Sequence, residues 1–194
     1  MKLSNLAEGT EDFTGNVWKL ENNSETILID AGEGDVWQRI QELEKIDKVV
    51  VTHSHHDHVK NLEKIVEKFN PEIFAFEPGN LNAEAEKFSE GEKIEPADIE
   101  FEVFHTPGHR DDSVCLYSGE EKILFTGDLI FPDGKFGRTD LAQGDRDKLI
   151  KSIKKISELD IKEFYPGHGD AVTDRANSWI RKSLENAEKR ESKY

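Results

Sequence analysis

Four of the chain's seven histidines fall in one short segment, His-Ser-His-His-Asp-His, which begins at His53. The run of apolar and β-branched residues at 48–52 comes directly before it and predicts a buried strand. Side chains two positions apart in an extended segment point the same way, so His53 and His55 can bind one metal ion together. Asp57 continues this parity and offers oxygen, whereas His58 is expected to point elsewhere. The segment therefore predicts a metal site with room for two ions.

Three later segments each place a possible metal ligand next to a glycine, just beyond a predicted strand. They are Thr106-Pro107-Gly108-His109, Thr126-Gly127-Asp128 and Tyr165-Pro166-Gly167-His168. Glycine lets the backbone turn sharply, so ligands at several strand ends can converge on one site. Imidazole and carboxylate ligands without sulfur suit zinc, manganese or iron. We therefore expect His109, Asp128 and His168 to complete the metal site.

Hydrophobic periodicity predicts the elements that must position these ligands. Strands are expected at 16–20 and 26–30, joined by a polar turn at 21–24, and at 48–52, 72–76, 99–104, 113–117, 122–126 and 164–165. Helices are expected at 35–43, 59–69, 81–88, 145–156 and 173–189. Both halves of the chain run from strands to helices, which predicts one α/β domain over residues 1–194 with two similar halves.

Composition narrows the classes of partner. The net charge of −15 repels nucleic acid and anionic membranes, so we expect neither as a partner. One cysteine excludes an internal disulfide, and Cys115 lies in an apolar strand, where we expect it to be part of the core. The first twenty residues lack a signal-peptide pattern and no stretch is apolar enough to span a membrane, which favours a cytoplasmic protein. The oligomeric state is left open.

The order H-x-H-x-D-H, T-P-G-H, G-D and G-H resembles the metallo-β-lactamase superfamily. Within that family, the segment that follows Asp128 and contains Phe136-Gly137-Arg138-Thr139-Asp140-Leu141 is similar to the glyoxalase II-like hydrolases. The anchors of the resemblance extend from residue 52 to residue 169. The resemblance implies a four-layer αββα sandwich, with two mixed β-sheets face to face and helices on the outer faces.

The resemblance also implies how the metal ligands divide. His53, His55 and His109 would bind one divalent ion, Asp57, His58 and His168 a second, and Asp128 would bridge the two. Zinc is the first expectation, with iron or manganese as alternatives. Two cations that share a water lower its pKa toward neutrality, which makes it a nucleophile for the carbonyl of a thioester or another activated acyl compound. The expected substrate is a small acyl molecule, and Asp57 and Asp128 are the expected catalytic carboxylates.

Arg138 is a candidate for binding a substrate carboxylate, since a guanidinium group matches that shape. A structural ion pair with Asp140 or Asp145 is an equal alternative. Two departures from glyoxalase II argue against a glutathione thioester as the substrate. Only a segment about one helix long follows His168, so no separate glutathione-binding domain is expected, and Asp170 stands where that family tends to have tyrosine.

Three other polar residues are expected to support the site rather than bind metal. His56 and His105 lie outside the family pattern, and we expect the first at the surface or behind the ligands and the second beneath the site. Asp30, which ends a predicted strand before Ala31-Gly32, is either a hydrogen-bond acceptor behind the ligands or a turn residue.

Two other functions fit parts of the pattern. A persulfide dioxygenase shares the resemblance but would use a single iron, held here by His53, His109 and Asp128. A non-catalytic metal-binding module is the third interpretation. The complete set of seven ligands favours the hydrolase with two metal ions.

Overall fold

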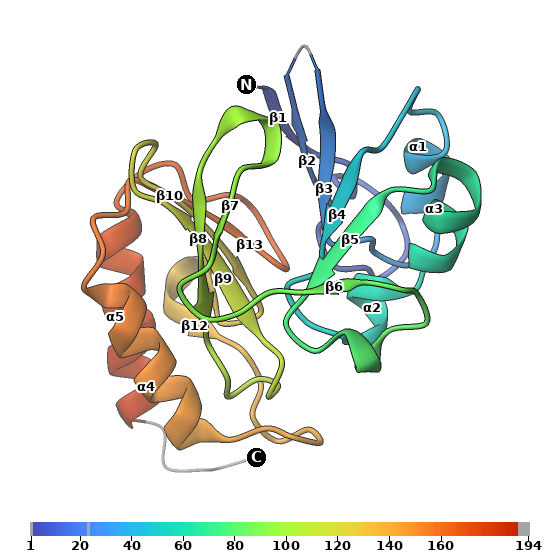
Figure 1. The fold of residues 1–194 in the computed structure, drawn as a ribbon. Helices are drawn as coiled ribbons and strands as arrows, with labels where there is room; N and C mark the ends of the chain where they lie inside the picture. The colour runs from blue at the N-terminus through green and yellow to red at the C-terminus, as the bar shows by residue number, and fades with distance from the viewer. Residues whose placement is uncertain (1, 23, 190–194) are drawn as a thin grey trace. The chain divides into compact units, whose positions relative to one another are not determined.

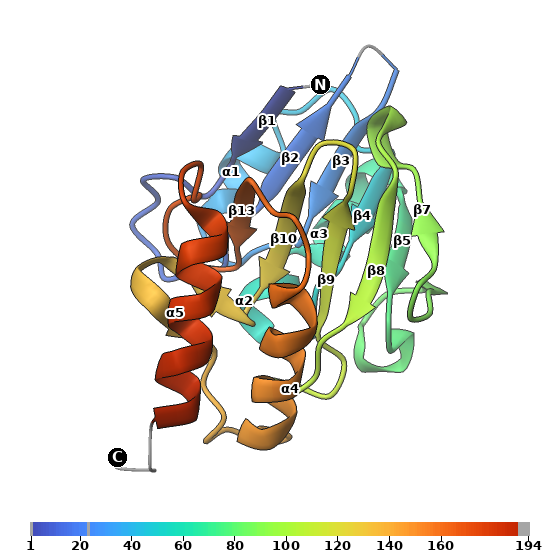
Figure 2. The same ribbon diagram turned by 90° about the vertical axis from the view of Figure 1, so that its left-hand side faces the viewer.

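The computed structural model describes residues 2–22 and 24–189. The chain divides into two compact units, Met1–Val103 and Phe104–Tyr194. Figures 1 and 2 show that each unit contains β-strands and helices, and in each unit the strand pairing includes both parallel and antiparallel neighbours. The expectation of mixed sheets with helices is therefore confirmed.

The N-terminal unit is built on a six-stranded sheet in sequence order. Its strands are β1 (Lys2–Asn5), β2 (Trp18–Glu21), β3 (Thr26–Ile29), β4 (Lys48–Val50), β5 (Glu72–Ala75) and β6 (Glu86–Lys87). β1, β2 and β3 pair antiparallel, and β3 to β6 pair parallel. The predicted hairpin is confirmed as β2 and β3, although its turn includes residue 23, which lies outside the described residues. Since β3, β4 and β5 run parallel, the loops that follow them leave the same edge of the sheet.

Helices α1 (Val36–Ile40), α2 (His56–Val59) and α3 (Leu62–Phe69) follow these strands. The apolar side chains of α1 and α3 pack with those of the sheet in one core cluster, to which Ile40, Ile65 and Val49 belong. α3 ends at Asn70, which adopts the left-handed conformation at φ 49° before Pro71. At the end of the unit, a short 3-10 turn (Pro96–Asp98) lies between β7 (Lys93–Ile94) and β8 (Phe101–His105). The boundary between the two units falls within β8.

Two helix predictions in this unit need correction. The helix predicted at 81–88 is wrong: the segment contains the short strand β6, which pairs parallel with β5. The exposed edge of β5 offers hydrogen bonds along its backbone, and this tertiary pairing outweighs a weak local helical pattern. The helix predicted at 59–69 is two helices, because the chain already turns helical at His56 and breaks before Leu62.

The C-terminal unit is built around β9 (Val114–Ser118), β10 (Ile123–Gly127) and β13 (Glu163–Pro166). β10 pairs antiparallel with β9 and parallel with β13. A small hairpin of β11 (Ile130–Phe131) and β12 (Lys135–Phe136) follows β10. Helices α4 (Arg146–Ser157) and α5 (Ala176–Lys189) lie side by side (Figure 2).

The second core cluster joins these helices to the strands of their own unit. Leu149 and Ile153 of α4 and Ile180 of α5 are fully buried with Leu124 of β10. Cys115 is also fully buried there, which confirms it as a core residue. Asp145 begins α4 by accepting a hydrogen bond from the backbone N–H of the third residue beyond it, a normal N-cap.

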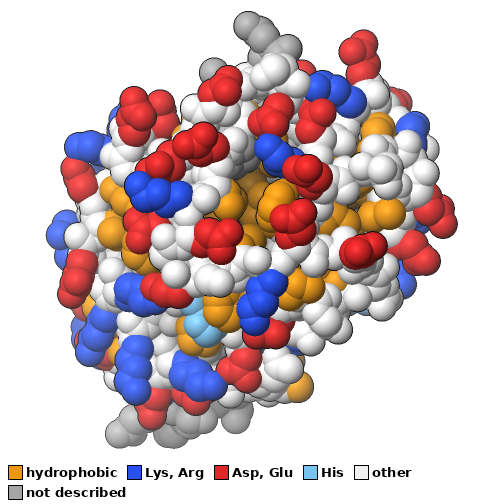
Figure 3. Space-filling view, viewed as in Figure 1, with side chains coloured by type: hydrophobic (Ala, Val, Ile, Leu, Met, Phe, Trp, Pro, Cys, Tyr) orange, Lys and Arg blue, Asp and Glu red, His pale blue; other side chains and the backbone are white. Residues whose placement is uncertain are grey.

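The face drawn in Figure 3 intersperses lysine and arginine side chains among the more numerous carboxylates. Mixed signs of this kind moderate the local field that the net charge of −15 would otherwise create. Every helix in the described part of the chain is too short or too polar to cross a lipid bilayer.

Candidate metal centre

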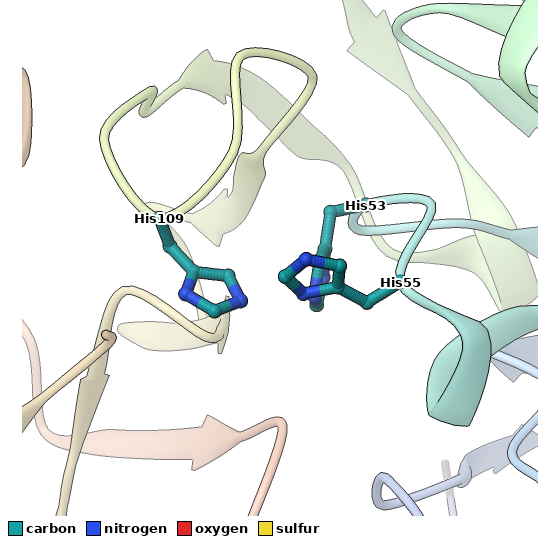
Figure 4. Close-up of side chains that lie close together, drawn as sticks. All are labelled: His53, His55 and His109. Carbon is teal, nitrogen blue, oxygen red and sulfur yellow. The ribbon is translucent and has the colours of Figure 1, made fainter. Parts of the chain in front are cut away.

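The candidate ligands of the N-terminal unit lie on one loop that leaves β4 and turns into α2, and Figure 4 shows His53 and His55 on this loop. The rings of His53 and His55 meet edge-on with centroids 5.0 Å apart. The ring of His58 is closer still to that of His53, at 4.2 Å. The prediction that His58 points elsewhere is therefore wrong. It assumed a fully extended segment, whereas the helical turn beginning at His56 carries His58 back toward His53.

Asp30 lies behind this loop, 2% exposed, directly after β3. Its carboxylate accepts a hydrogen bond from the Thr52 backbone N–H (2.7 Å), one from the Thr52 hydroxyl (2.7 Å) and one from Nδ1 of His58 (2.7 Å). Nδ1 of His53 lies 3.2 Å from the same hydroxyl. Asp30 is thus the predicted acceptor behind the ligands, and its left-handed backbone (φ 64°) is one that aspartate tolerates.

These contacts determine which nitrogen of each ring carries hydrogen. The Thr52 hydroxyl has a single hydrogen and donates it to Asp30, so it can only accept from Nδ1 of His53. Nδ1 of His58 likewise donates to the Asp30 carboxylate. In both rings Nε2 is then the nitrogen that presents a lone pair, as a metal ligand requires.

The segment between β1 and β2 contacts the other side of this loop. The backbone N–H of Gly15 donates to the carbonyl of Asp57 (3.0 Å). A Cβ at Gly15 would lie 2.8 Å from the His58 ring, so only glycine fits without displacing that ring. The side chains of Asp57 and His58 approach to 4.0 Å between Oδ2 and Nε2.

The C-terminal unit supplies its ligands from three separate loops. Asp128 follows β10 and His168 follows β13, and because these strands are parallel, both residues leave the same sheet edge. The backbone N–H of Gly167 donates to the carbonyl of Gly127 (2.8 Å), which joins the two loops next to the ligands. Oδ2 of Asp128 lies 3.5 Å from Nε2 of His168.

His109 lies on the loop between β8 and β9, also drawn in Figure 4. Its Nδ1 is 2.8 Å from the backbone carbonyl of Arg138, which can only accept, so Nδ1 carries the hydrogen and Nε2 the lone pair. That Nε2 lies 3.4 Å from Oδ2 of Asp128. The loop is pressed against α4: Gly108 has φ 137°, and a Cβ there would lie 2.2 Å from the Leu149 backbone nitrogen.

The distances around Asp128 fit a shared ion. Two donors about 2.1 Å from one tetrahedral metal lie about 3.4 Å apart, close to the 3.4 Å and 3.5 Å that separate Asp128 Oδ2 from His109 and His168. In the N-terminal unit the ligand atoms of His53 and His55, and those of His53 and His58, come within 4.8 Å of each other. Nitrogen and oxygen donors without sulfur suit a divalent ion such as zinc, iron or manganese. The residues present therefore fit the metals that the sequence predicts.

Three residues that sequence analysis singled out lie outside this set of ligands. Arg138 makes a bidentate pair with Asp140, at 2.9 and 2.8 Å, which lowers the pKa of that carboxyl. Both side chains are exposed, and the alternative pair with Asp145 is not the one that forms. His56 is at the surface beside Glu33 (3.1 Å), and Nε2 of His105 lies 2.7 Å from the backbone carbonyl of Asp111.

Several supporting residues carried no signal in the sequence. The roles of Thr52 and Gly15 become visible only from their contacts with Asp30 and Asp57, which the fold brings close to them. Gly137 belongs to the segment that resembles glyoxalase II, but its role comes from the fold, because a Cβ there would lie 1.9 Å from the Asp128 carbonyl oxygen. Tyr165 packs on Phe125 near the end of β13, and burial together with Glu163 raises its pKa far above the usual value, so the phenol stays protonated.

Comparison with known proteins identifies a matching family and several relatives. A family model described as the metallo-β-lactamase superfamily matches residues 10–168. Hydroxyacylglutathione hydrolase GloC of Haemophilus influenzae is 34% identical over 184 residues, which cover 81% of this chain and 85% of that protein. Several other curated relatives are longer, and the chain spans 60% of their length.

Solved structures agree. BLEG-1, a B3 metallo-β-lactamase, is 26% identical, with a TM-score of 0.75 over 95% of this chain and 97% of that one. TTHA1623 in a di-iron-bound form is also 26% identical, with a TM-score of 0.71 over 89% and 92%. The ligand motifs, the mixed sheets and these likenesses lead to one conclusion: the chain has the metallo-β-lactamase fold and belongs to the metallo-β-lactamase superfamily.

Proposed function

We propose that this protein is a hydrolase with two divalent metal ions that cleaves a thioester or a related activated acyl bond. The observation that carries the proposal is the Asp128 carboxylate, one oxygen of which lies at ion-sharing distance from both His109 and His168. A carboxylate so placed suits the bridging role that the family resemblance implies. His53, His55 and His109 would hold one ion, and Asp57, His58 and His168 the other.

Bound metals would supply a water that is acidic near neutral pH and would polarise the substrate carbonyl. The chain's own residues have the task of presenting the ligands. Asp30 and the Arg138 carbonyl set the hydrogen on Nδ1 of His58 and His109, so that Nε2 of each ring would be the nitrogen that holds a metal. Asp57, 20% exposed at its side chain, is the carboxylate we propose to orient the nucleophile. Cys115 is fully buried and is not a nucleophile.

The substrate class follows from chemistry and from the relatives. The Haemophilus protein is named for hydrolysis of an acylated glutathione, which is a thioester. We propose a small acyl thioester or lactone here, a cytoplasmic location, and zinc as the first metal with iron or manganese as alternatives. Hydrolysis does not change the oxidation state of the metal, so each of these divalent ions would serve.

The test combines metal content with turnover. The protein is purified, loaded separately with zinc, manganese and ferrous iron, and analysed by mass spectrometry; we expect about two ions per chain. The loaded forms are then assayed on a panel of acyl thioesters and lactones, and chelation should abolish turnover that added metal restores. One iron per chain, with oxygen uptake on glutathione persulfide and no hydrolysis, would instead identify a dioxygenase. Metal binding without turnover of any of these compounds would identify a binding module.

A further inference from the structure

Helix α4 presents a buried polar side chain to the loop that carries His109. Of the four buried residues of this helix, three are apolar and belong to the core cluster, and the fourth is Ser152, which is 4% exposed. A serine inside a helix commonly bonds to a carbonyl of its own helix. The Ser152 hydroxyl instead donates to the carbonyl of Pro107, at 2.7 Å. The helix therefore holds the loop two residues before the candidate ligand.

Lys155 makes a second bond from the same face of α4, since residues three apart in a helix are neighbours. Its ammonium group donates to the carbonyl of His105 at 2.9 Å and lies 6.0 Å from the centre of the Phe104 ring. The lysine is only partly exposed, so water competes less with this charged hydrogen bond than it would at an open surface. His105 is the last residue of β8, so the bond fixes the point at which the loop begins.

Two more contacts join α4 to the loop on either side of His109. The backbone N–H of Asp145, the N-cap of α4, donates to the carbonyl of Gly108 (2.8 Å), and the ammonium group of Lys148 pairs with the Asp111 carboxylate (2.7 Å). The side chains of this ion pair are 46% and 53% exposed, and pairs so exposed contribute little. The first contact involves only backbone atoms. The two shielded bonds to the carbonyls are therefore the side-chain contacts of α4 that should matter most to the loop.

The imidazole ring of His109 is oriented from a segment that leads into the same helix. Its Nδ1 donates to the carbonyl of Arg138, which lies seven residues before the N-cap of α4. This segment turns back on itself, because the backbone N–H of Gly144 donates to the carbonyl of Leu141 (2.9 Å). The backbone and the ring of His109 are thus both held relative to the start of α4.

We infer that Ser152 and Lys155 are positioning residues for His109, and that the affinity of the ion held by His109 depends on both side chains. This inference rests on the assignment of His109 as a metal ligand in the proposed function. A nitrogen ligand binds zinc at about 2.0–2.1 Å in a defined geometry, so a small shift of the loop weakens the bond. Packing of α4 against the core would be served better by an apolar residue than by a buried hydroxyl.

The experiment measures metal binding instead of turnover. Zinc affinity is determined by competition with a chromogenic chelator, and the visible absorption of cobalt-loaded protein reports the geometry around the ion. S152A/K155M should bind one of the two ions about 10- to 100-fold more weakly than wild type and should shift the cobalt bands. S152T and K155R keep a hydrogen-bond donor at each position, and each should restore most of the affinity lost in S152A or K155M.

The matched control is K154M. Lys154 is the neighbour of Lys155 on the same helix, but it pairs with Glu188 of α5 at 2.8 Å, so its loss should leave zinc affinity and cobalt bands as in wild type. Circular dichroism and urea denaturation establish that each variant is folded. If S152A/K155M does not fold, K155M alone decides, because its side chain is partly exposed and its loss should not unfold the chain.

The outcomes separate this inference from the proposed function. A folded variant with wild-type zinc affinity and wild-type cobalt bands would exclude the positioning role, even if its stability has fallen. A wild-type protein that binds two ions and hydrolyses nothing would overturn the hydrolase proposal, while the loss of affinity in the variants would still establish the positioning role. A wild-type protein that binds no metal would overturn both.

Discussion

The two compact units hold their candidate metal ligands by different means. In the N-terminal unit, four ligands come from one short loop, and a polar network centred on Asp30 orients two of them. In the C-terminal unit, three ligands come from three loops, and close backbone packing at glycines positions those loops. The first arrangement depends on the chemistry of one buried carboxylate and the second on the absence of side chains. The two units should therefore fail under different substitutions.

The largest effect is expected at Asp128, which contacts both other ligands of its unit. Asp128→Ala should lower turnover by about a thousandfold or more and reduce bound metal from about two ions per chain to below one, because a bridging ligand serves both ions. Mass spectrometry and the thioester assay measure these outcomes. Asp133→Asn, at an exposed carboxylate five residues on, is the control and should change neither. Full metal content in Asp128→Ala would exclude the bridging role.

Asp30→Asn tests the polar network of the N-terminal unit. The amide keeps the shape and tolerates the left-handed backbone, but it loses the charge and one acceptor, so the rings of His53 and His58 lose their fixed orientation. Metal affinity should fall by about 10- to 100-fold, measured by competition with a chromogenic chelator. Asp47→Asn is the matched control: Asp47 also accepts a backbone N–H in this unit, from Thr26 (2.7 Å), and its loss should leave metal affinity as in wild type.

A pair of glycine substitutions compares the units directly. Gly137→Ala sets a methyl group against the Asp128 carbonyl, which cannot move without the ligand, and should cost about 2–3 kcal/mol in the free energy of unfolding as well as metal. Gly15→Ala meets only the edge of the His58 ring, so its cost in stability should be smaller, about 1 kcal/mol, with the loss concentrated in metal affinity. Urea denaturation and chelator competition measure both. Equal stability losses in the two variants would contradict the contrast between the units.

Arg138→Ala should have the smallest effect. The side chain pairs with Asp140 at the surface, where such pairs contribute little, and the contact to His109 comes from the backbone carbonyl, which the substitution retains. We expect stability within about 0.5 kcal/mol of wild type and kcat/KM within about twofold. A large rise in KM confined to substrates with a carboxylate would show instead that Arg138 binds that group.

Much of the fold was predictable because local patterns coincide with tertiary structure there. The run at 48–52 is the buried strand β4, and the periodic segments near α3, α4 and α5 are helices. The helix predicted at 81–88 failed because a neighbouring strand edge, which local periodicity does not report, captured part of that segment. Local periodicity also did not report the helical turn that begins at His56 after β4, so the direction of the His58 side chain was not predicted.

The sequence by itself determined which side chains are available to bind metal and that each follows a strand, since residue type and hydrophobic period are local properties. Only the tertiary structure decided which nitrogen of each ring is left with a lone pair for a metal ion. The groups that set this, Asp30 for His58 and the Arg138 carbonyl for His109, are 28 and 29 positions away along the chain. A hydrogen-bond acceptor at that separation is brought to its ring by the packing of strands and loops, and no local pattern specifies it.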